Sequence, residues 1–273
     1  MSKCAVIVSR NDNYGENLVT RAKHCIYNLT NVFDKIVYVD WKLKHKALTD
    51  NFTLPDNVHV IRITEEVIKK NWPQYINYPV VETVGRNIGI RYAIDDGQDW
   101  ICSTNIDIIM NSFDCEGWDQ NTLYTARRRN IEKEVYNEYK DTNDLLNFIN
   151  HKKDNFDIAP LAVVNGKGVW DPGDHWSLAV CCGDFQMAHR ELWGEIRGFE
   201  EEMGGRCYAD SNLMKRPILI GKKTAIADVD VFHLNHNNFS EREEEEFLPL
   251  NDQTKYVTNW AKSTNTINWG TFS

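Results

Sequence analysis

Short apolar runs alternate with stretches of helical periodicity through the first part of the chain, and this alternation restricts the fold more than any other feature. The continuous apolar run at Cys4–Ser9 is typical of a strand that is buried on both faces, and the next expected strands are Lys35–Trp41 and Val58–Thr64. Apolar residues recur at helical spacing around them, at 16–33 and 80–95. Strands that alternate with helices predict an α/β fold with a mostly parallel sheet and right-handed crossovers.

The second part of the chain is less regular. We expect strands at 122–128 and 224–234, a strand that continues into a helix at 177–196, and a polar helical stretch at 130–156. No internal repeat and no linker-like segment divides the sequence, so we expect a single mixed domain over residues 1–273.

The composition excludes several functional classes. A formal net charge of −9 over 273 residues argues against general nucleic-acid binding, because a phosphate backbone requires a basic surface. No apolar run reaches the roughly 20 residues of a membrane span, and the N-terminus lacks the apolar region of a signal peptide. The cysteines Cys4, Cys102, Cys181 and Cys182 lie in apolar runs, as is typical of free thiols in a reducing compartment. We therefore expect a cytoplasmic protein without a membrane span.

Polar side chains follow three of the expected strands. Ser9 and Arg10 stand at the end of the first strand, Asp40 ends the second, and Asn105 and Asp107 lie toward the end of a further strand expected at 100–109. Open α/β sheets bind their ligands at the carboxyl ends of the strands. Asn105 and Asp107 are two residues apart, so along a continuous strand they point the same way and can hold one divalent cation together with diphosphate oxygens. The alternative is a strand end that is polar but binds no ligand.

Other candidate residues lie further along the chain. Arg86, in the helix at 80–95, is either a clamp for a diphosphate or a surface arginine. Asp184 and Asp210 stand where helix caps are common, and each is alternatively a ligand contact, with Asp210 as a general base. His233, at the end of the last strand, is either a structural side chain or a ligand of Mn²⁺, and its strand position favours it over His236.

Five segments occur in one order along the chain: SRNDNYGEN, GRNIGIRYAIDDGQDWICSTNIDIIM, GDFQMAHRELWGEIRGFEEE, YADSNL and VFHLNH. This series resembles the GT-A fold nucleotide-sugar glycosyltransferases, in particular the family-2-like group. The resemblance covers residues 4–236 and is weakest at 121–177. It implies a Rossmann-like, mostly parallel central sheet flanked by helices, with a nucleotide-binding part at 1–112 and a more irregular acceptor and catalytic part at 113–273.

The resemblance also implies a donor site with Mn²⁺ or Mg²⁺ as the cofactor. Asp107 matches the carboxylate of the D-x-D metal motif, Asn105 replaces the first aspartate of that motif, and His233 matches the C-terminal metal-ligand histidine. Other matched positions would contact the nucleotide or the donor sugar, together with Asn105: Ser9, Arg10, Asp40, Arg86 and Asn87. Asp40 matches a position that often holds uracil or ribose, which favours a UDP-sugar over a GDP-sugar as the donor.

Two acids match the catalytic positions. Asp210 matches the general base of inverting members, although Ala209 and Asn212 replace the flanking acids, and Asp184 matches an acid that borders the donor sugar and the acceptor. The implied reaction moves a sugar from a nucleoside-diphosphate sugar to a hydroxyl of a glycan or another acceptor, with inversion at the anomeric carbon. A retaining outcome stays open at this point.

Two rival interpretations remain. The substitutions Asn105, Ala209 and Asn212 are compatible with an inactive relative that only binds a nucleotide sugar or a glycan. A nucleotidyltransferase has a similar α/β scaffold, but it requires a phosphate loop rich in glycine and basic residues, whereas the segment SRNDNYGEN has one glycine and no lysine.

Overall fold

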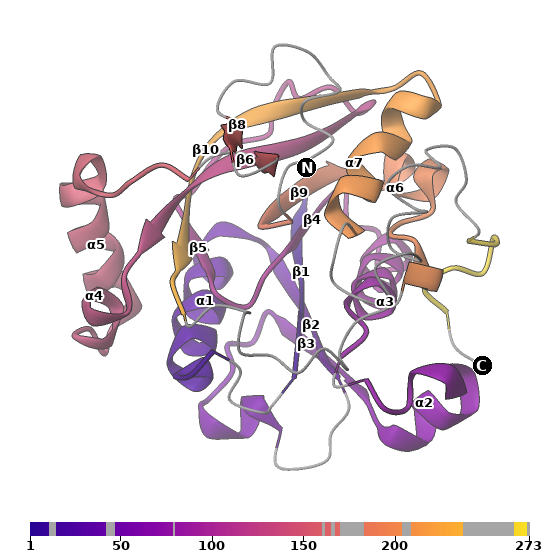
Figure 1. The fold of residues 1–273 in the computed structure, drawn as a ribbon, viewed down its shortest axis with the longest axis horizontal. Helices are drawn as coiled ribbons and strands as arrows, with labels where there is room; N and C mark the ends of the chain where they lie inside the picture. Colours follow the sequence, from indigo (N-terminus) through magenta and orange to yellow (C-terminus); the bar gives the residue numbers. More distant parts are fainter. Residues whose placement is uncertain are drawn as a thin grey trace.

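One eight-stranded sheet takes strands from both parts of the chain (Figure 1). The computed structural model describes residues 1–10, 15–41, 47–78, 80–159, 162–164, 167–169, 183–203, 209–236 and 265–271. The strands of this sheet are β1 (Lys3–Ser9), β2 (Lys35–Trp41), β3 (Val58–Ile63), β4 (Trp100–Thr104), β5 (Ile108–Met110), β6 (Thr122–Ile131), β9 (Phe185–His189) and β10 (Lys223–Leu234).

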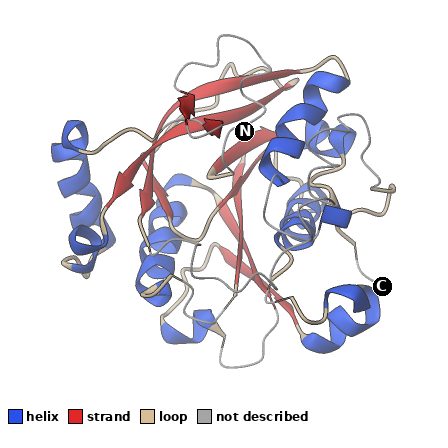
Figure 2. Cartoon of the chain, in the orientation of Figure 1, coloured by secondary structure: helices blue, strands red, loops and turns tan. Residues whose placement is uncertain are grey.

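The strand order is β3-β2-β1-β4-β9-β6-β10-β5. The first four strands are parallel to one another, and β6 is parallel to β10, whereas β9 and β5 run antiparallel to their neighbours. Helices flank this sheet, as Figure 2 shows. The predicted α/β fold with a mostly parallel sheet is therefore confirmed.

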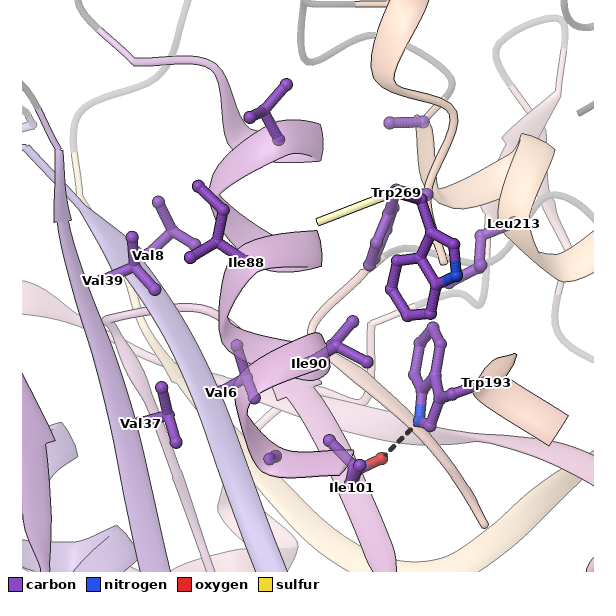
Figure 3. Close-up of a cluster of buried hydrophobic side chains, with 14 of the residues drawn as sticks. Val6, Val8, Val37, Val39, Ile88, Ile90, Ile101, Trp193, Leu213 and Trp269 are labelled. Carbon is purple, nitrogen blue, oxygen red and sulfur yellow. Dashed lines mark hydrogen bonds between the residues drawn. The ribbon is translucent and has the colours of Figure 1, made fainter. Parts of the chain in front are cut away.

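Helices cover both faces of the parallel strands. Helix α1 (Leu18–Val32) packs on one face with Ala5 and Ile7 of β1, and α3 (Glu82–Asp95) packs on the other face with Val6 and Val8 (Figure 3). This arrangement explains why β1 is continuously apolar from Cys4 to Val8 instead of alternating.

Two glycines let α3 approach the sheet closely. A Cβ at Gly89 would lie 2.4 Å from Cγ1 of Val6, and one at Gly85 would lie 2.8 Å from Cγ1 of Val8. Larger side chains at these positions would push the helix away from β1. The segment GRNIG therefore combines a packing surface with Arg86, which lines the cavity described below.

Further described elements complete the fold. They are α2 (Glu65–Asn71), α4 (Lys133–Asn137), α5 (Thr142–Lys152), α6 (Arg190–Ile196), α7 (Ala209–Leu219), the hairpin of β7 (Ala162–Val164) and β8 (Lys167–Val169), and the 3₁₀ turns Leu48–Asn51, Pro73–Tyr75, Lys153–Asn155 and Glu201–Met203. The polar helical stretch expected at 130–156 forms α4 and α5, which cover a separate apolar cluster around Leu145 and Phe232. Among the described helices, none combines the length and apolar character that a membrane crossing requires.

The apolar run at 100–109 is not one strand. Strand β4 ends at Thr104, residues 105–107 form a turn, and β5 pairs antiparallel with β10 at the far edge of the sheet. The expectation that Asn105 and Asp107 point the same way along a continuous strand is therefore wrong. The physical reason is that the chain must leave β4 to reach β10, where the Asp107 carbonyl accepts a hydrogen bond from the Leu234 N–H at 2.9 Å.

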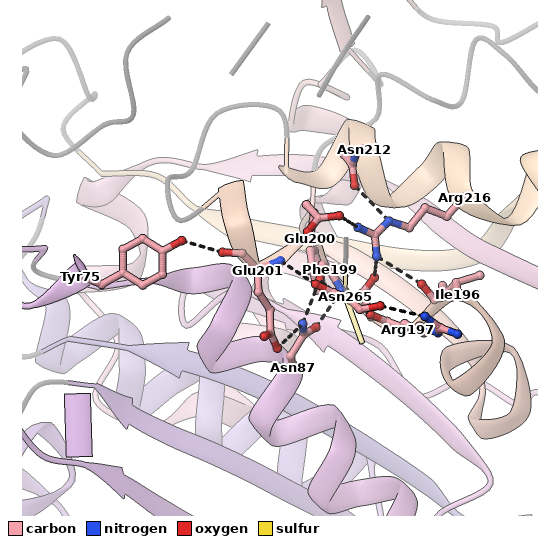
Figure 4. Close-up of polar contacts among 11 residues, drawn as sticks. Tyr75, Asn87, Ile196, Arg197, Phe199, Glu200, Glu201, Asn212, Arg216 and Asn265 are labelled. Atoms are coloured by element: carbon pink, nitrogen blue, oxygen red, sulfur yellow. Dashed lines mark hydrogen bonds and ion pairs between the residues drawn. The ribbon is translucent and has the colours of Figure 1, made fainter. Parts of the chain in front are cut away.

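Helix α7 is held by a buried ion pair. The Arg216 guanidinium donates to Glu200 Oε2 at 2.9 Å and to Asn212 Oδ1 at 3.1 Å (Figure 4). Asn265, from the C-terminal segment, donates to the Arg197 carbonyl at 2.6 Å beside this pair. A buried charge without such partners would be costly, so the network fixes α7 against the turn that follows α6.

The described cysteines bear out the expectation for two of the four thiols. Cys4 and Cys102 are buried and free, and burial raises the pKa of Cys4 to about 12. Cys181 and Cys182 lie outside the described residues.

Candidate active site

A cavity of about 280 Å³ opens at the carboxyl ends of β1 and β4. It collects most of the residues that the sequence singles out, although they come from distant parts of the chain. Its polar lining consists of Ser9, Arg10, Glu82, Arg86, Asn105, Asp107, Arg128, Asp184, Asp210, His233 and His236. Of these, Glu82, Arg128 and His236 are absent from the site residues that the sequence predicts.

Asp107 and two histidines form the one group of described acidic, cysteine and histidine side chains whose arrangement could hold a metal ion. Their ligand atoms all lie within 4.8 Å of one another. The Nε2 atom of His236 lies 3.1 Å from Asp107 Oδ2, and that of His233 lies 3.8 Å from the same oxygen. Both histidines therefore reach the site, although the sequence favoured His233 alone; the H-x-x-H spacing is the signal that could have added His236.

The donor set fits a divalent cation. Asp107 Oδ1 is buried and has no hydrogen-bond partner among the described residues. Burial also lowers the pKa of His233, which favours the neutral imidazole that binds metals. One carboxylate with two imidazoles suits Mn²⁺ better than Mg²⁺, because Mg²⁺ prefers oxygen ligands.

Arg21 is a site residue that the sequence analysis missed. It is fully buried on α1, and its Nη1 donates to Asp107 Oδ2 at 2.9 Å. Burial opposes the ionisation of Asp107, but His233, His236 and Arg21 outweigh it and hold the pKa of this carboxyl well below its usual range. The available signal was the position of Arg21 on the apolar face of a helix, three residues after Leu18.

Asp210 lies in the first turn of α7 and lines the same cavity. Burial raises its pKa to about 6, the nearby acids Glu82 and Asp184 add to the effect, and Arg86 opposes it. The backbone of Gly183 packs so closely that a Cβ there would lie 2.2 Å from Asp210 Oδ1. A carboxylate with a pKa near the working pH is suited to accept a proton.

Among the described residues, the side chains of Asn105 and Arg128 hold Asp184. Its Oδ1 accepts from Asn105 Nδ2 at 2.7 Å, and its Oδ2 accepts a short hydrogen bond from Arg128. Asn105 Oδ1 in turn accepts a short hydrogen bond from Arg86. Arg86 also donates to Ser103 Oγ at 2.7 Å, so much of its guanidinium is engaged inside the protein.

Two predicted donor-site residues do not line this cavity. Asp40 is fully buried at the end of β2, in register with Ser9, and its oxygens have no partner within the described part of the chain. Burial raises the pKa of Asp40 to about 6, against the opposing effect of Arg62. Asn87 instead bonds the Phe199 backbone, donating to its carbonyl at 2.8 Å and accepting from its N–H at 2.7 Å.

Comparison with known proteins identifies the fold. No family model matches the sequence, and no curated protein matches it. Among solved structures, GalNAc-T7 crystallised with UDP, GalNAc and Mn²⁺ has a similar fold, with a TM-score of 0.54 and 13% sequence identity. The match covers 86% of this chain and 44% of the GalNAc-T7 chain. The chain thus has a GT-A-like glycosyltransferase fold and spans less than half the length of that neighbour.

Proposed function

We propose that this protein is a metal-dependent glycosyltransferase that moves a sugar from a nucleoside-diphosphate sugar to a hydroxyl of a glycan or another acceptor. The observation that carries the proposal is the meeting of two different carboxylates in one cavity of a GT-A-like fold. Asp107 lies among cationic and metal-binding groups, and Asp210 has a pKa raised to about 6. A UDP-sugar is the favoured donor and a GDP-sugar the second choice.

The donor diphosphate belongs on the Asp107 side of the cavity. Asp107, His233 and His236 would hold Mn²⁺ or Mg²⁺, which when bound would neutralise the diphosphate and make it a better leaving group. Ser9 and Arg10, at the end of β1, line the cavity and would contact the nucleotide. The contact of Asp40 with the uracil or the ribose stays a prediction from the sequence, because Asp40 is fully buried and does not line this cavity.

The acceptor hydroxyl belongs on the Asp210 side. Asp210 would take the proton of that hydroxyl as its oxygen attacks the anomeric carbon. Direct displacement inverts the anomeric configuration, and the Asp184 carboxylate would stabilise the positive charge that develops on the sugar ring. An NMR spectrum of the fresh product gives its anomeric configuration, and retention would exclude Asp210 as the base of a single displacement.

Calorimetric titration of UDP and GDP tests the proposal, with Mn²⁺ and again with EDTA. We expect binding of one nucleotide that requires Mn²⁺ and is lost in Asp107→Ala and His236→Ala. Asp154→Ala is a matched control, because Asp154 is an exposed aspartate outside the cavity.

The outcomes separate the rival functions. Nucleotide binding without transfer or hydrolysis of any nucleotide sugar would identify a binding protein instead of an enzyme. Absence of binding for both nucleotides would contradict a glycosyltransferase that uses either donor class.

A further inference from the structure

We propose that Asn105 is a positioning residue that holds the Asp184 carboxylate in the cavity, and that the site requires an amide at this position. The resemblance to glycosyltransferases presents Asn105 as a replaced metal-motif aspartate, whereas its contacts give it a different task. The inference rests on the proposed function only where it treats the cavity as the donor-sugar site.

Asn105 lies between a cation and an anion. Its Oδ1 accepts from the Arg86 guanidinium, and its Nδ2 donates to Asp184 Oδ1 at 2.7 Å. A guanidinium can only donate and a carboxylate can only accept, so one orientation of the amide satisfies both neighbours. The two ends of the asparagine side chain therefore match two different partners.

An aspartate at position 105 would match only one of these partners. It would accept from Arg86, but its second oxygen would face Asp184 Oδ1 at about the same 2.7 Å without a proton between them. Two carboxylates at this distance repel each other strongly. The cavity already contains the acids Glu82 and Asp210, so a further negative charge would add to the repulsion that Arg86 and Arg128 have to offset.

Asp184 is tied to the end of β4 at two points. Thr104 Oγ1 donates to the Asp184 carbonyl at 2.5 Å, and the next residue, Asn105, donates to its carboxylate. Arg128 holds the other carboxylate oxygen. Asp184 is 3% exposed, so these contacts set the direction in which a buried charge faces the cavity.

Because of the turn after β4, the residue that positions Asp184 is not the residue proposed to bind the metal. Asn105 faces Arg86 and Asp184, whereas Asp107 faces Arg21 and His236. The two polar residues of the segment NID thus contact different groups of charged side chains.

The test exchanges the two side chains. In N105D we expect the melting temperature to fall by about 4 °C or more, while the dissociation constant for Mn²⁺ stays within about twofold of wild type. In the double variant N105D/D184N the hydrogen bonds can re-form in exchanged order, because the new amide at position 184 can donate to the new carboxylate at position 105 and accept from Arg128. We expect the double variant to regain most of the lost melting temperature.

Kinetics separates positioning from simple stability. The double variant restores the hydrogen bonds but moves the carboxylate to position 105, so we expect kcat for sugar transfer to stay low while the affinity for Mn²⁺–UDP is unchanged. Asn155→Asp is the matched control, because it makes the same change at an exposed position.

Two results would overturn the proposal. Tighter Mn²⁺ binding by N105D, by about tenfold and without loss of stability, would identify residue 105 as a weakened metal ligand. If the double variant is no more stable than N105D, the contact with Asp184 is not the reason for the amide at position 105. If wild type binds neither UDP nor GDP, the proposed function fails, but the melting temperatures still test Asn105.

Discussion

Two carboxylates that line the same cavity, those of Asp107 and Asp210, have pKa values shifted in opposite directions. Asp107 is surrounded by Arg21, His233 and His236, which outweigh its burial and hold its pKa well below the usual range. Asp210 faces other acids and packs against Gly183, and burial raises its pKa to about 6. Both carboxylates line one cavity of about 280 Å³.

The difference shows that the neighbouring groups, and not the residue type, determine whether a carboxylate stays ionised or exchanges a proton near neutral pH. A carboxylate that stays ionised at every physiological pH can hold a cation, and one that titrates near neutral pH can accept and release a proton. The proposed division of the cavity into a donor side and an acceptor side depends on this contrast.

Removal of the Asp210 carboxylate should have the largest effect. We expect Asp210→Asn to lower kcat for sugar transfer by about 1,000-fold, because the variant cannot accept the acceptor proton. The affinity for Mn²⁺–UDP should stay at the wild-type value, as measured by calorimetry. An equal loss in kcat for the exposed control Asp154→Asn would break the contrast between the two sides.

Removal of the buried cation on the Asp107 side should come next. We expect Arg21→Met to lower the free energy of unfolding by about 3 kcal/mol, because it leaves a buried carboxylate without its guanidinium partner. Urea unfolding measures this change. Arg62→Met, which breaks an exposed ion pair of 3.5 Å with Asp50, should cost less than about 1 kcal/mol.

Metal binding should stabilise only proteins with an intact Asp107 side. At Mn²⁺ concentrations of about 100 times the dissociation constant, the stabilisation should reach about 2.7 kcal/mol, and EDTA should reverse it. Thermal unfolding should show this gain in wild type and in Asp210→Asn, and should not show it in His236→Ala. A gain retained by His236→Ala would place the metal elsewhere.

The smallest effect concerns pH. The folded-state pKa of Asp210, about 6, lies above its ordinary value of 3.8, so its contribution to stability is complete below pH 3.8 and is lost as pH rises through 6. The variant Asp210→Asn does not lose stability in this way, because an asparagine side chain does not ionise. With EDTA present, the melting temperature of the variant should therefore gain a few degrees on wild type between pH 4 and pH 7. A constant difference across this range would contradict the raised pKa.

The sequence predicted the parallel half of the fold well. The runs at Cys4–Ser9 and Lys35–Trp41 became β1 and β2 because a strand buried on both faces needs continuous apolar residues, a property visible without any tertiary information. Strand ends then indicated where polar groups would gather. The same pattern predicted a single strand at 100–109, whereas the structure has two strands, β4 and β5. The short turn between them does not interrupt the apolar pattern enough to be predicted.

Partners across the cavity were beyond the reach of the sequence. Arg21 and Asp107 are separated by 86 residues, and Arg128 and Asp184 by 56. No local periodicity relates such positions, so a charged residue on an apolar helix face was the sole indication that Arg21 needed a buried partner.

Local pattern alone thus determined the α/β class, the edge of the sheet where the site lies and most of the residues that line it. The tertiary structure alone decided which side chain each of them faces. Strand and helix formation depends on neighbours along the chain, whereas pKa values, ion pairs and the task of Asn105 depend on neighbours in space.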